Sequence, residues 1–294
     1  MSIQVIPNTL VEHSYNSEAV YFPTTPLYHQ EGETVYTHSI PPTVNNPHWP
    51  GTTQVKLNIR IGDKTCASQG TLVGPRHVLT SSDLIYSPLS AQGWASEITV
   101  QSILNGPIYA VLKAYTFTEW TEQKDPRYNI ALLILSKSLK KYTGWSGMLS
   151  VPDSYLQGRK VSISETQQIL QKVEPDRFHY ASPLPETLTG TALQIQRWKT
   201  CMVIGLETRD KDQKAYTLRL TPHKIEAISK KIAESFKKYP FFGKVEWTYH
   251  FGDVGEEPPL PPNIKEILNA PCPIWPDKKV YDCLLYTSPS PRDA

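Results

Sequence analysis

Residues 66–86 read CASQGTLVGPRHVLTSSDLIY, and the sequence on both sides of this stretch indicates the fold. The stretch contains two short apolar runs, at 71–73 and 77–80, with a Gly-Pro turn signal between them. Just upstream, apolar and polar residues alternate over 55–61. Alternation with a period of two is typical of a strand that buries one face. The region therefore predicts consecutive short β-strands.

Further short apolar runs follow at 98–100, 108–112, 130–135, 161–163 and 202–206. Gly, Pro, Asn or Asp residues mark many of the turns between these runs. Many short strands separated by turns favour a barrel or a sandwich over a sheet with crossover helices. The sequence thus predicts an all-β protein.

One helix is expected near the end of this region. Thr221 is a good N-cap, and Pro222 suits the first helical position. Apolar residues then recur at helical spacing until Pro240, namely Ile225, Ile228, Ile232 and Phe236.

Composition excludes several classes of protein. The chain has 294 residues, 39% hydrophobic and 20% charged, with a formal net charge of +2. This balance predicts no attraction to nucleic acid or to an acidic membrane. The Cys and His residues are scattered without metal-ligand spacing, so we expect no metal and no cofactor. The sequence has neither an apolar run long enough to span a bilayer nor a secretory signal, which predicts a cytoplasmic protein.

The two ends of the chain differ from its middle. Residues 1–45 are polar and dotted with Pro, which predicts an extended N-terminal arm. Residues 241–282 are expected to form a Pro-rich linker and the start of a truncated module. Residues 283–294 resemble the translation of an adapter used in DNA sequencing libraries, so we expect this segment to be an artefact.

Four blocks resemble the trypsin-like serine peptidases, and most of all their glutamyl-endopeptidase branch. The stretch at 66–86 resembles the family block C-S-G-T-L-I-G-P-x-x-V-L-T-A-A-H-C-V-Y. Residues 128–135 are similar to Y-D-[IY]-A-[LV]-[LI]-x-L, and T-G-W-F-G is matched by residues 143–148. The segment 188–195 stands at the place of G-G-N-S-G-S-P-V. The last block resembles V-I-G-I-H-T, then G-V-R-I-T-P and the C-terminal helix, over residues 203–208 and 216–222.

The resemblance implies a fold and a site. It places a peptidase-like domain at residues 46–240, made of two six-stranded antiparallel β-barrels with a C-terminal α-helix. The active site of this family lies between the barrels. The family's disulfide is not matched, so Cys66 is expected to be a free, buried thiol.

The residues at the family's catalytic positions have changed. Its mechanism needs a hydroxyl nucleophile, an imidazole base and an orienting carboxylate. The base position holds Asp83 and the orienting position holds Asn129. The nucleophile position holds Ala192 when the block is aligned on Gly190, or Thr191 when it is aligned on the strand that follows.

Three further residues are candidates for contacts with a ligand. Glu207 stands where the glutamyl branch has the His of its specificity pocket, so the charge is inverted for an acidic side chain. Gly190 is expected to keep part of the turn that supplies the oxyanion hole, and His179 is a candidate for lining the cleft. The resemblance therefore implies an inactive homologue that binds a peptide or protein segment or serves as a scaffold. The alternative is an active hydrolase with a non-standard nucleophile, such as Thr191.

Overall fold

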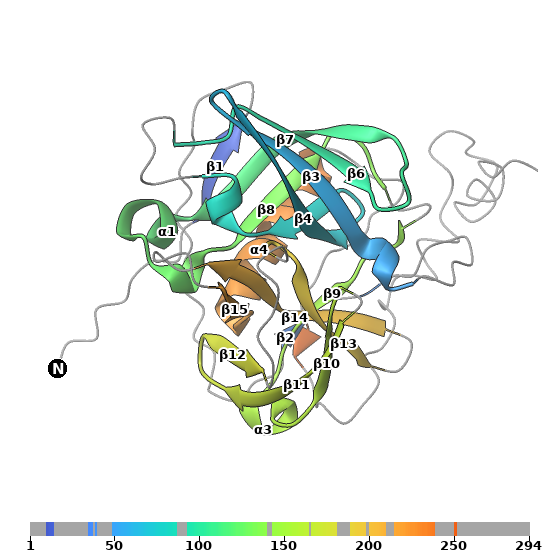
Figure 1. Cartoon of the computed structure of the whole chain (residues 1–294), viewed down its shortest axis with the longest axis vertical. Helices are drawn as coiled ribbons and strands as arrows, with labels where there is room; N and C mark the ends of the chain where they lie inside the picture. The colour runs from blue at the N-terminus through green and yellow to red at the C-terminus, as the bar shows by residue number, and fades with distance from the viewer. Residues whose placement is uncertain are drawn as a thin grey trace, which may run out of the picture.

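A computed structural model describes residues 10–14, 35–37, 39, 49–86, 93–139, 143–164, 166–180, 189–197, 200–209, 215–238 and 250–251. The described strands form two barrels, one above the other in Figure 1, with helix α4 (Pro222–Lys238) against their junction. This arrangement confirms the predicted all-β architecture with a C-terminal helix.

The first barrel closes on itself with six antiparallel strands. They follow one another around the barrel in the order β3 (Gln54–Ile61), β4 (Lys64–Gly74), β5 (His77–Thr80), β8 (Ala131–Leu135), β7 (Ile108–Phe117) and β6 (Glu97–Ser102). Pairing of β6 with β3 and of β7 with β8 completes the ring.

Strand β3 shows how the alternation of apolar and polar residues corresponds to burial. Val55, Leu57 and Ile59 are fully buried, while the polar residues between them are exposed, as the alternation predicts. In β4, by contrast, residues 64–67 are all exposed. Cys66 is a free thiol, as expected, but the prediction that it is buried is wrong, because it lies in this exposed stretch.

The second barrel is also closed by six antiparallel strands. Their order is β10 (Lys160–Ile163), β11 (Thr166–Val173), β12 (Arg177–Tyr180), β15 (Ala215–Arg219), β14 (Thr200–Arg209) and β13 (Ala192–Arg197). The ring closes because β13 pairs with both β14 and β10. Strand β9 (Gly147–Ser150) runs parallel to β14 and extends the sheet outward.

Short segments beyond the barrels add to both sheets. Strand β1 (Leu10–Ser14) pairs with β7, while β2 (Val35–Tyr36) lies between β9 and β16 (His250–Phe251). Two parts of the predicted N-terminal arm are therefore strands: β1 adds to the sheet of the first barrel, and β2 adds to the sheet of the second. Of the predicted linker and truncated module, 241–282, the structure describes residues 250–251; the segment 283–294 lies outside the described residues, and the predicted domain boundaries stay predictions.

Short helices fill the connections between strands. They are α1 (Thr118–Gln123), α3 (Asp153–Leu156), and three 3-10 turns, η1 (Gly51–Thr53), η2 (Ser82–Leu84) and η3 (Pro126–Tyr128). Among the described helices, none has both the length and the apolar character needed to cross a bilayer. The cytoplasmic location stays a prediction.

One apolar cluster joins the two barrels to helix α4. It includes Phe117 of the first barrel, Leu206 of the second, and Ile225, Ile228 and Ile232 of the helix. All five side chains are at most 1% exposed, so the predicted apolar face of the helix is confirmed for these three isoleucines. The shared core fixes the barrels against each other, and the loops at their junction gain defined positions.

Candidate functional site

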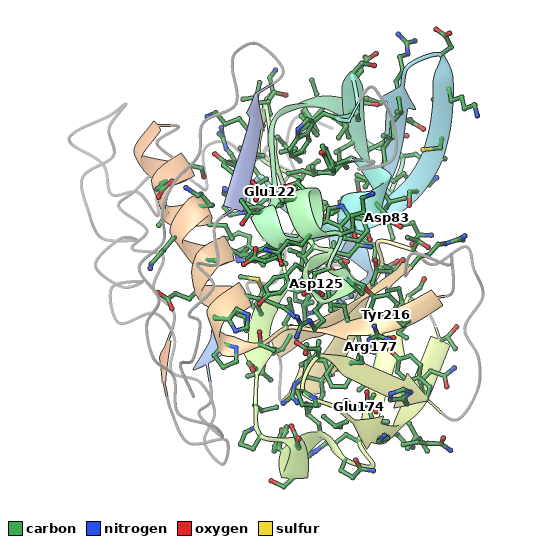
Figure 2. The ribbon with its side chains drawn as sticks, turned by 90° about the vertical axis from the view of Figure 1, so that its left-hand side faces the viewer. Asp83, Glu122, Asp125, Glu174, Arg177 and Tyr216 are labelled. Atoms are coloured by element: carbon green, nitrogen blue, oxygen red, sulfur yellow. The ribbon has the colours of Figure 1, made fainter. Side chains whose placement is uncertain are left out.

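Asp83 lies in the turn η2, at the level where the two barrels meet (Figure 2). Its carboxylate contacts the hydroxyl of Ser81, two residues earlier. The Ser81 oxygen also lies 3.0 Å from Asn129 Oδ1 and 2.5 Å from the hydroxyl oxygen of Thr208. Burial raises the pKa of the Asp83 carboxyl, and hydrogen bonds to Ser81 and Asn129 oppose the rise.

Asn129 ends the turn η3 and is fully buried. Its side-chain oxygen accepts a hydrogen bond of 2.9 Å from the backbone N–H of Asp83. Its amide nitrogen donates to the backbone carbonyl of Arg209, at 3.0 Å. Asn129 therefore connects the Asp83 turn to the end of β14, and the structure brings these two predicted counterparts of the catalytic residues together.

Gly190 occupies a turn that only glycine fits. Its φ is +88°, and a Cβ atom there would lie 2.3 Å from the carbonyl oxygen of Gln69 and 2.6 Å from the Thr80 hydroxyl. Its N–H donates to the carbonyl of Glu207, at 2.8 Å. The turn thus rests on strands β4, β5 and β14 at once, beside the loop that carries Asp83.

Thr191 and Ala192, the two alternatives for the nucleophile position, follow Gly190 directly and are both buried. The hydroxyl of Thr191 donates to the side-chain oxygen of Gln69, at 3.1 Å. Ala192 starts β13, and its N–H points to the hydroxyl of Thr71 at 3.4 Å. Of the two positions, only Thr191 offers a nucleophilic atom, and its hydroxyl is hydrogen-bonded to an amide oxygen, which is not a base.

Glu207 is buried in the second barrel with only 3% of its surface exposed. Its Oε1 accepts a hydrogen bond of 3.0 Å from the Tyr180 hydroxyl, and another from the hydroxyl of Thr217. Burial raises the pKa of Glu207 to about 7, while the two hydrogen bonds act in the opposite direction. Burial also raises the pKa of Tyr180 well above its usual range. A neutral carboxyl hydrogen-bonded to two hydroxyls can therefore persist near neutral pH.

His179 faces away from this cluster. It precedes Tyr180 on β12, and successive side chains of a strand point to opposite faces. Its ring is 48% exposed, and Nε2 lies 3.3 Å from Glu174 Oε1. The structure therefore brings Gly190 and Glu207 together through a backbone hydrogen bond, but it does not bring His179 to them.

Several polar partners at the site were not singled out from the sequence. They include Ser81, Thr208 and Gln69. For Ser81 a signal existed, because it stands where the family block has Ala. Thr208 and Gln69 lie inside the matched blocks, but no local pattern marks them as polar partners.

A buried imidazole also escaped the sequence reasoning. His77 on β5 lies with its Nε2 atom 2.5 Å from the hydroxyl of Ser235 on α4. Burial and the charge of Arg76 lower the pKa of His77 to about 3. The ring is fully buried and stays neutral over the physiological range. This pair therefore anchors the helix to the first barrel and is not placed to reach a substrate.

Within the described residues, no group of three or more His, Cys, Asp or Glu side chains is placed to hold a metal ion. The absence of a metal and of a cofactor from the function of the protein stays a prediction, because the search covers only part of the chain.

Comparison of the fold identifies its class. The structure of a Glu endopeptidase, in complex with MPD, superposes with a TM-score of 0.53 at 14% identity, covering 69% of this chain and 97% of that chain. The protein therefore has the fold of the chymotrypsin-like serine peptidases, as the sequence resemblance implies. The scabies mite inactivated protease paralogue S-I1 gives a TM-score of 0.44 at 14% identity, over 64% of this chain and 95% of that one.

Comparison of the sequence gives a partial match. No protein-family model matches the chain. The extracellular metalloprotease of Bacillus subtilis (strain 168) is 30% identical over 118 residues, which cover 38% of this chain. The match covers 37% of that relative, so little more than a third of its length is shared.

Proposed function

We propose that this chymotrypsin-fold domain is a catalytically inactive peptidase homologue that binds a peptide or protein segment at the junction of its barrels. The observation that carries the proposal is the network around Ser81. It joins Asp83, Asn129 and Thr208 at the place where a peptidase needs an ionisable base beside its nucleophile.

The chemistry of this network argues against proton transfer from Thr191. An amide does not titrate, so Asn129 cannot act as a base or stabilise a positive imidazole. A carboxyl with a raised pKa is a better base than an ordinary one, but that of Asp83 contacts Ser81. The Thr191 hydroxyl donates to Gln69 instead. A nucleophile without a base loses several orders of magnitude in rate.

Binding of a peptide needs fewer chemical groups at the junction of the barrels than its cleavage does. The Gly190 turn and the end of β14 supply ordered backbone and polar groups at the junction, and they are held in place by contacts from both barrels. Pairing of an extended segment with an exposed strand edge is a common way for β-rich domains to bind peptides. These ordered groups, beside the positions that hold Asp83 and Asn129, support a binding module rather than a catalyst.

Activity is tested with a fluorophosphonate probe and a fluorescent peptide library. We expect neither labelling nor cleavage by the wild-type protein. Labelling that disappears in Thr191→Ala, but persists in the control Thr121→Ala on helix α1, would establish the active hydrolase and overturn the proposal.

Binding is tested on the same library with photo-crosslinking peptides. We expect crosslinks at residues 189–192 or 207–209, followed by identification of the peptide by mass spectrometry. A protein that captures no peptide of the library, or only peptides crosslinked far from these segments, would contradict the proposed binding role of the junction.

A further inference from the structure

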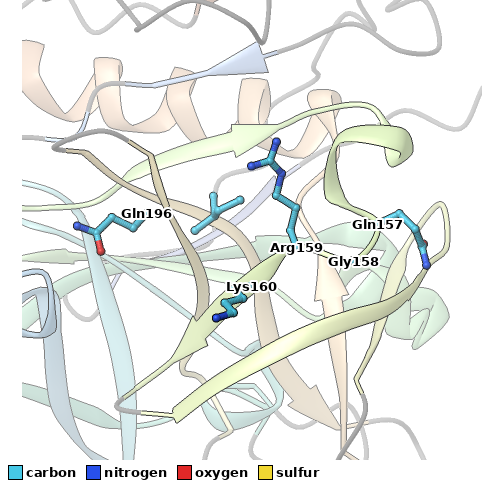
Figure 3. Close-up of a pocket in the computed structure, with 6 residues that line it drawn as sticks. Gln157, Gly158, Arg159, Lys160 and Gln196 are labelled. Atoms are coloured by element: carbon cyan, nitrogen blue, oxygen red, sulfur yellow. The ribbon is translucent and has the colours of Figure 1, made fainter.

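A pocket of about 540 Å³ lies on the second barrel, between strands β10 and β13. Its lining comes from the end of α3 and from the two strands, and consists of Gln157, Gly158, Arg159, Lys160, Ile195 and Gln196. Figure 3 shows Lys160 and Gln196 on the two strands, with Arg159 close by. None of these residues belongs to the junction of the barrels.

The pocket marks an interruption in the barrel wall. The antiparallel ladder of β10 and β13 joins residues 162–163 to 193–194 and stops there within the described residues. In the same register, Val161 would next stand opposite Ile195, and Lys160 would then stand opposite Gln196, but Lys160 and Gln196 line the pocket instead. On their other sides both strands remain paired, β10 with β11 and β13 with β14.

A register irregularity lies beside this ladder. The pairing of β13 with β14 shifts register between Leu193 and Gln194, which are the two β13 residues that pair with β10. The extra residue of this bulge is Ile204 on β14, because Leu193 pairs with Gly205 and Gln194 with Val203. Beyond Ser162 and Gln194, the facing edges of β10 and β13 form no further pairs within the described residues, and they resemble two short edge strands at the rim of a gap.

The lining of the gap is positively charged. It holds two cations and two amide side chains, and no acidic residue. The guanidinium of Arg159 is oriented, because its Nε donates to the Tyr155 carbonyl at 2.9 Å and its central carbon lies 4.0 Å from the centre of the Tyr155 ring. That bond uses one of five N–H donors of an arginine. Ile195, only 3% exposed, belongs to the buried core cluster of the second barrel, on which the pocket rests.

We propose that this gap binds an extended peptide that carries acidic side chains. Carboxylates complement Arg159 and Lys160, while strand edges and amide groups complement a peptide backbone. The volume lies in the range of sites that hold whole ligands, which favours a peptide over a single inorganic anion. Gln196 is four residues along β13 from Ala192, about 13 Å. This second site is independent of the proposed role of the junction.

The test measures fluorescence anisotropy with a labelled hexapeptide, TEVEVT, on the full chain. Its glutamine counterpart TQVQVT and inorganic phosphate serve as competitors. The pocket variant combines Arg159→Gln with Lys160→Gln. A matched control, Lys64→Gln with Lys137→Gln, removes two exposed positive charges from the first barrel. A photo-crosslinking form of the peptide, followed by mass spectrometry, locates the bound segment.

We expect the pocket variant to bind TEVEVT at least about tenfold more weakly, with the control unchanged and crosslinks at residues 157–160 and 195–196. Failure of the wild-type protein to bind at about 1 mM peptide overturns the proposal. The proposal is also overturned if TQVQVT binds as tightly as TEVEVT, or if the pocket variant binds TEVEVT as tightly as the wild-type protein does. Competition by phosphate as strong as that by the peptide indicates a free-anion site and overturns it as well. Crosslinks at residues 189–192 instead assign the peptide to the junction of the barrels. That result overturns the proposed second site and supports the proposed function.

Discussion

Acidification is expected to destabilise the protein through His77, which anchors helix α4 to the first barrel. The ring is fully buried against Ser235, and its pKa is lowered to about 3 by burial and by the charge of Arg76. In the unfolded chain the same imidazole titrates near 6.5. As the pH falls below 6.5, the unfolded state therefore takes up a proton that the folded state excludes.

The magnitude follows from the difference between the two pKa values. Each pH unit between 6.5 and about 3 removes about 1.4 kcal/mol of folding stability, and the full window removes roughly 5 kcal/mol. A typical domain has only about 5–15 kcal/mol in total. Loss of the His77 contribution alone is thus enough to bring the protein close to unfolding near pH 3.

The assay is urea unfolding at a series of pH values, on the wild-type protein and on His77→Gln. The glutamine amide can replace Nε2 as a partner of Ser235 but does not titrate. Other groups with shifted pKa values, such as Asp83 and Glu207, titrate in both proteins, so the difference between the two curves isolates His77. Stability curves that remain parallel from pH 7 to about pH 4 would refute the reasoning.

Three further perturbations have defined outcomes. Gly190→Ala should cost about 2–4 kcal/mol in urea unfolding, since φ is +88° and the added Cβ meets backbone at 2.3 Å, whereas the control Gly51→Ala meets nothing within 4 Å. A costless Gly190→Ala would mean that the turn is not held as described. Glu207 has a folded pKa of about 7 against 4.5, so its own contribution to folding stability should fall by about 3 kcal/mol as the pH rises from 4.5 to 7, opposite in sign to the contribution of His77. The stability of the wild-type protein minus that of Glu207→Gln should therefore fall by about 3 kcal/mol over this window, and a difference that stays constant would exclude this role of Glu207. Burial lowers the pKa of Lys224 from 10.5 to about 8, although Asp176 opposes the shift. The wild-type protein should therefore gain about 3 kcal/mol between pH 8 and 10.5, and Lys224→Met should not; the same gain in both proteins would contradict this.

The strands and the helix were predictable because their signals are local. The alternation over 55–61 marks the buried face of β3, and the spacing of Ile225, Ile228 and Ile232 marks the buried face of α4. Closure of the barrels came only from the resemblance, since no local pattern states which strands pair. Cys66 was predicted wrongly because exposure depends on where the barrel wall ends along β4.

The candidate site, like the fold, was predictable from the sequence only in part. The resemblance named Asp83 and Asn129, and the structure places them in contact across 46 positions of the chain. The resemblance also aligned Glu207 with the specificity-pocket position of the glutamyl branch, but it gave no sign that Thr217 donates a hydrogen bond to the Glu207 carboxyl. The roles of these residues, like those of Gly190, Thr191, Ala192 and His179, stay predictions until the experiments above are done.

By itself, the sequence determined the elements of this protein and the side chains at the positions that the resemblance aligns with a catalytic triad, because periodicity and residue identity are carried along the chain. Only the tertiary structure decided which groups meet. The bond from Thr191 to Gln69 spans 122 positions, and that from His77 to Ser235 spans 158. The ladder of β10 and β13 ends after two residue pairs, and Lys160 and Gln196 beyond it line a pocket. Such contacts depend on how the barrels close and pack, and burial then sets the pKa values of the groups they enclose.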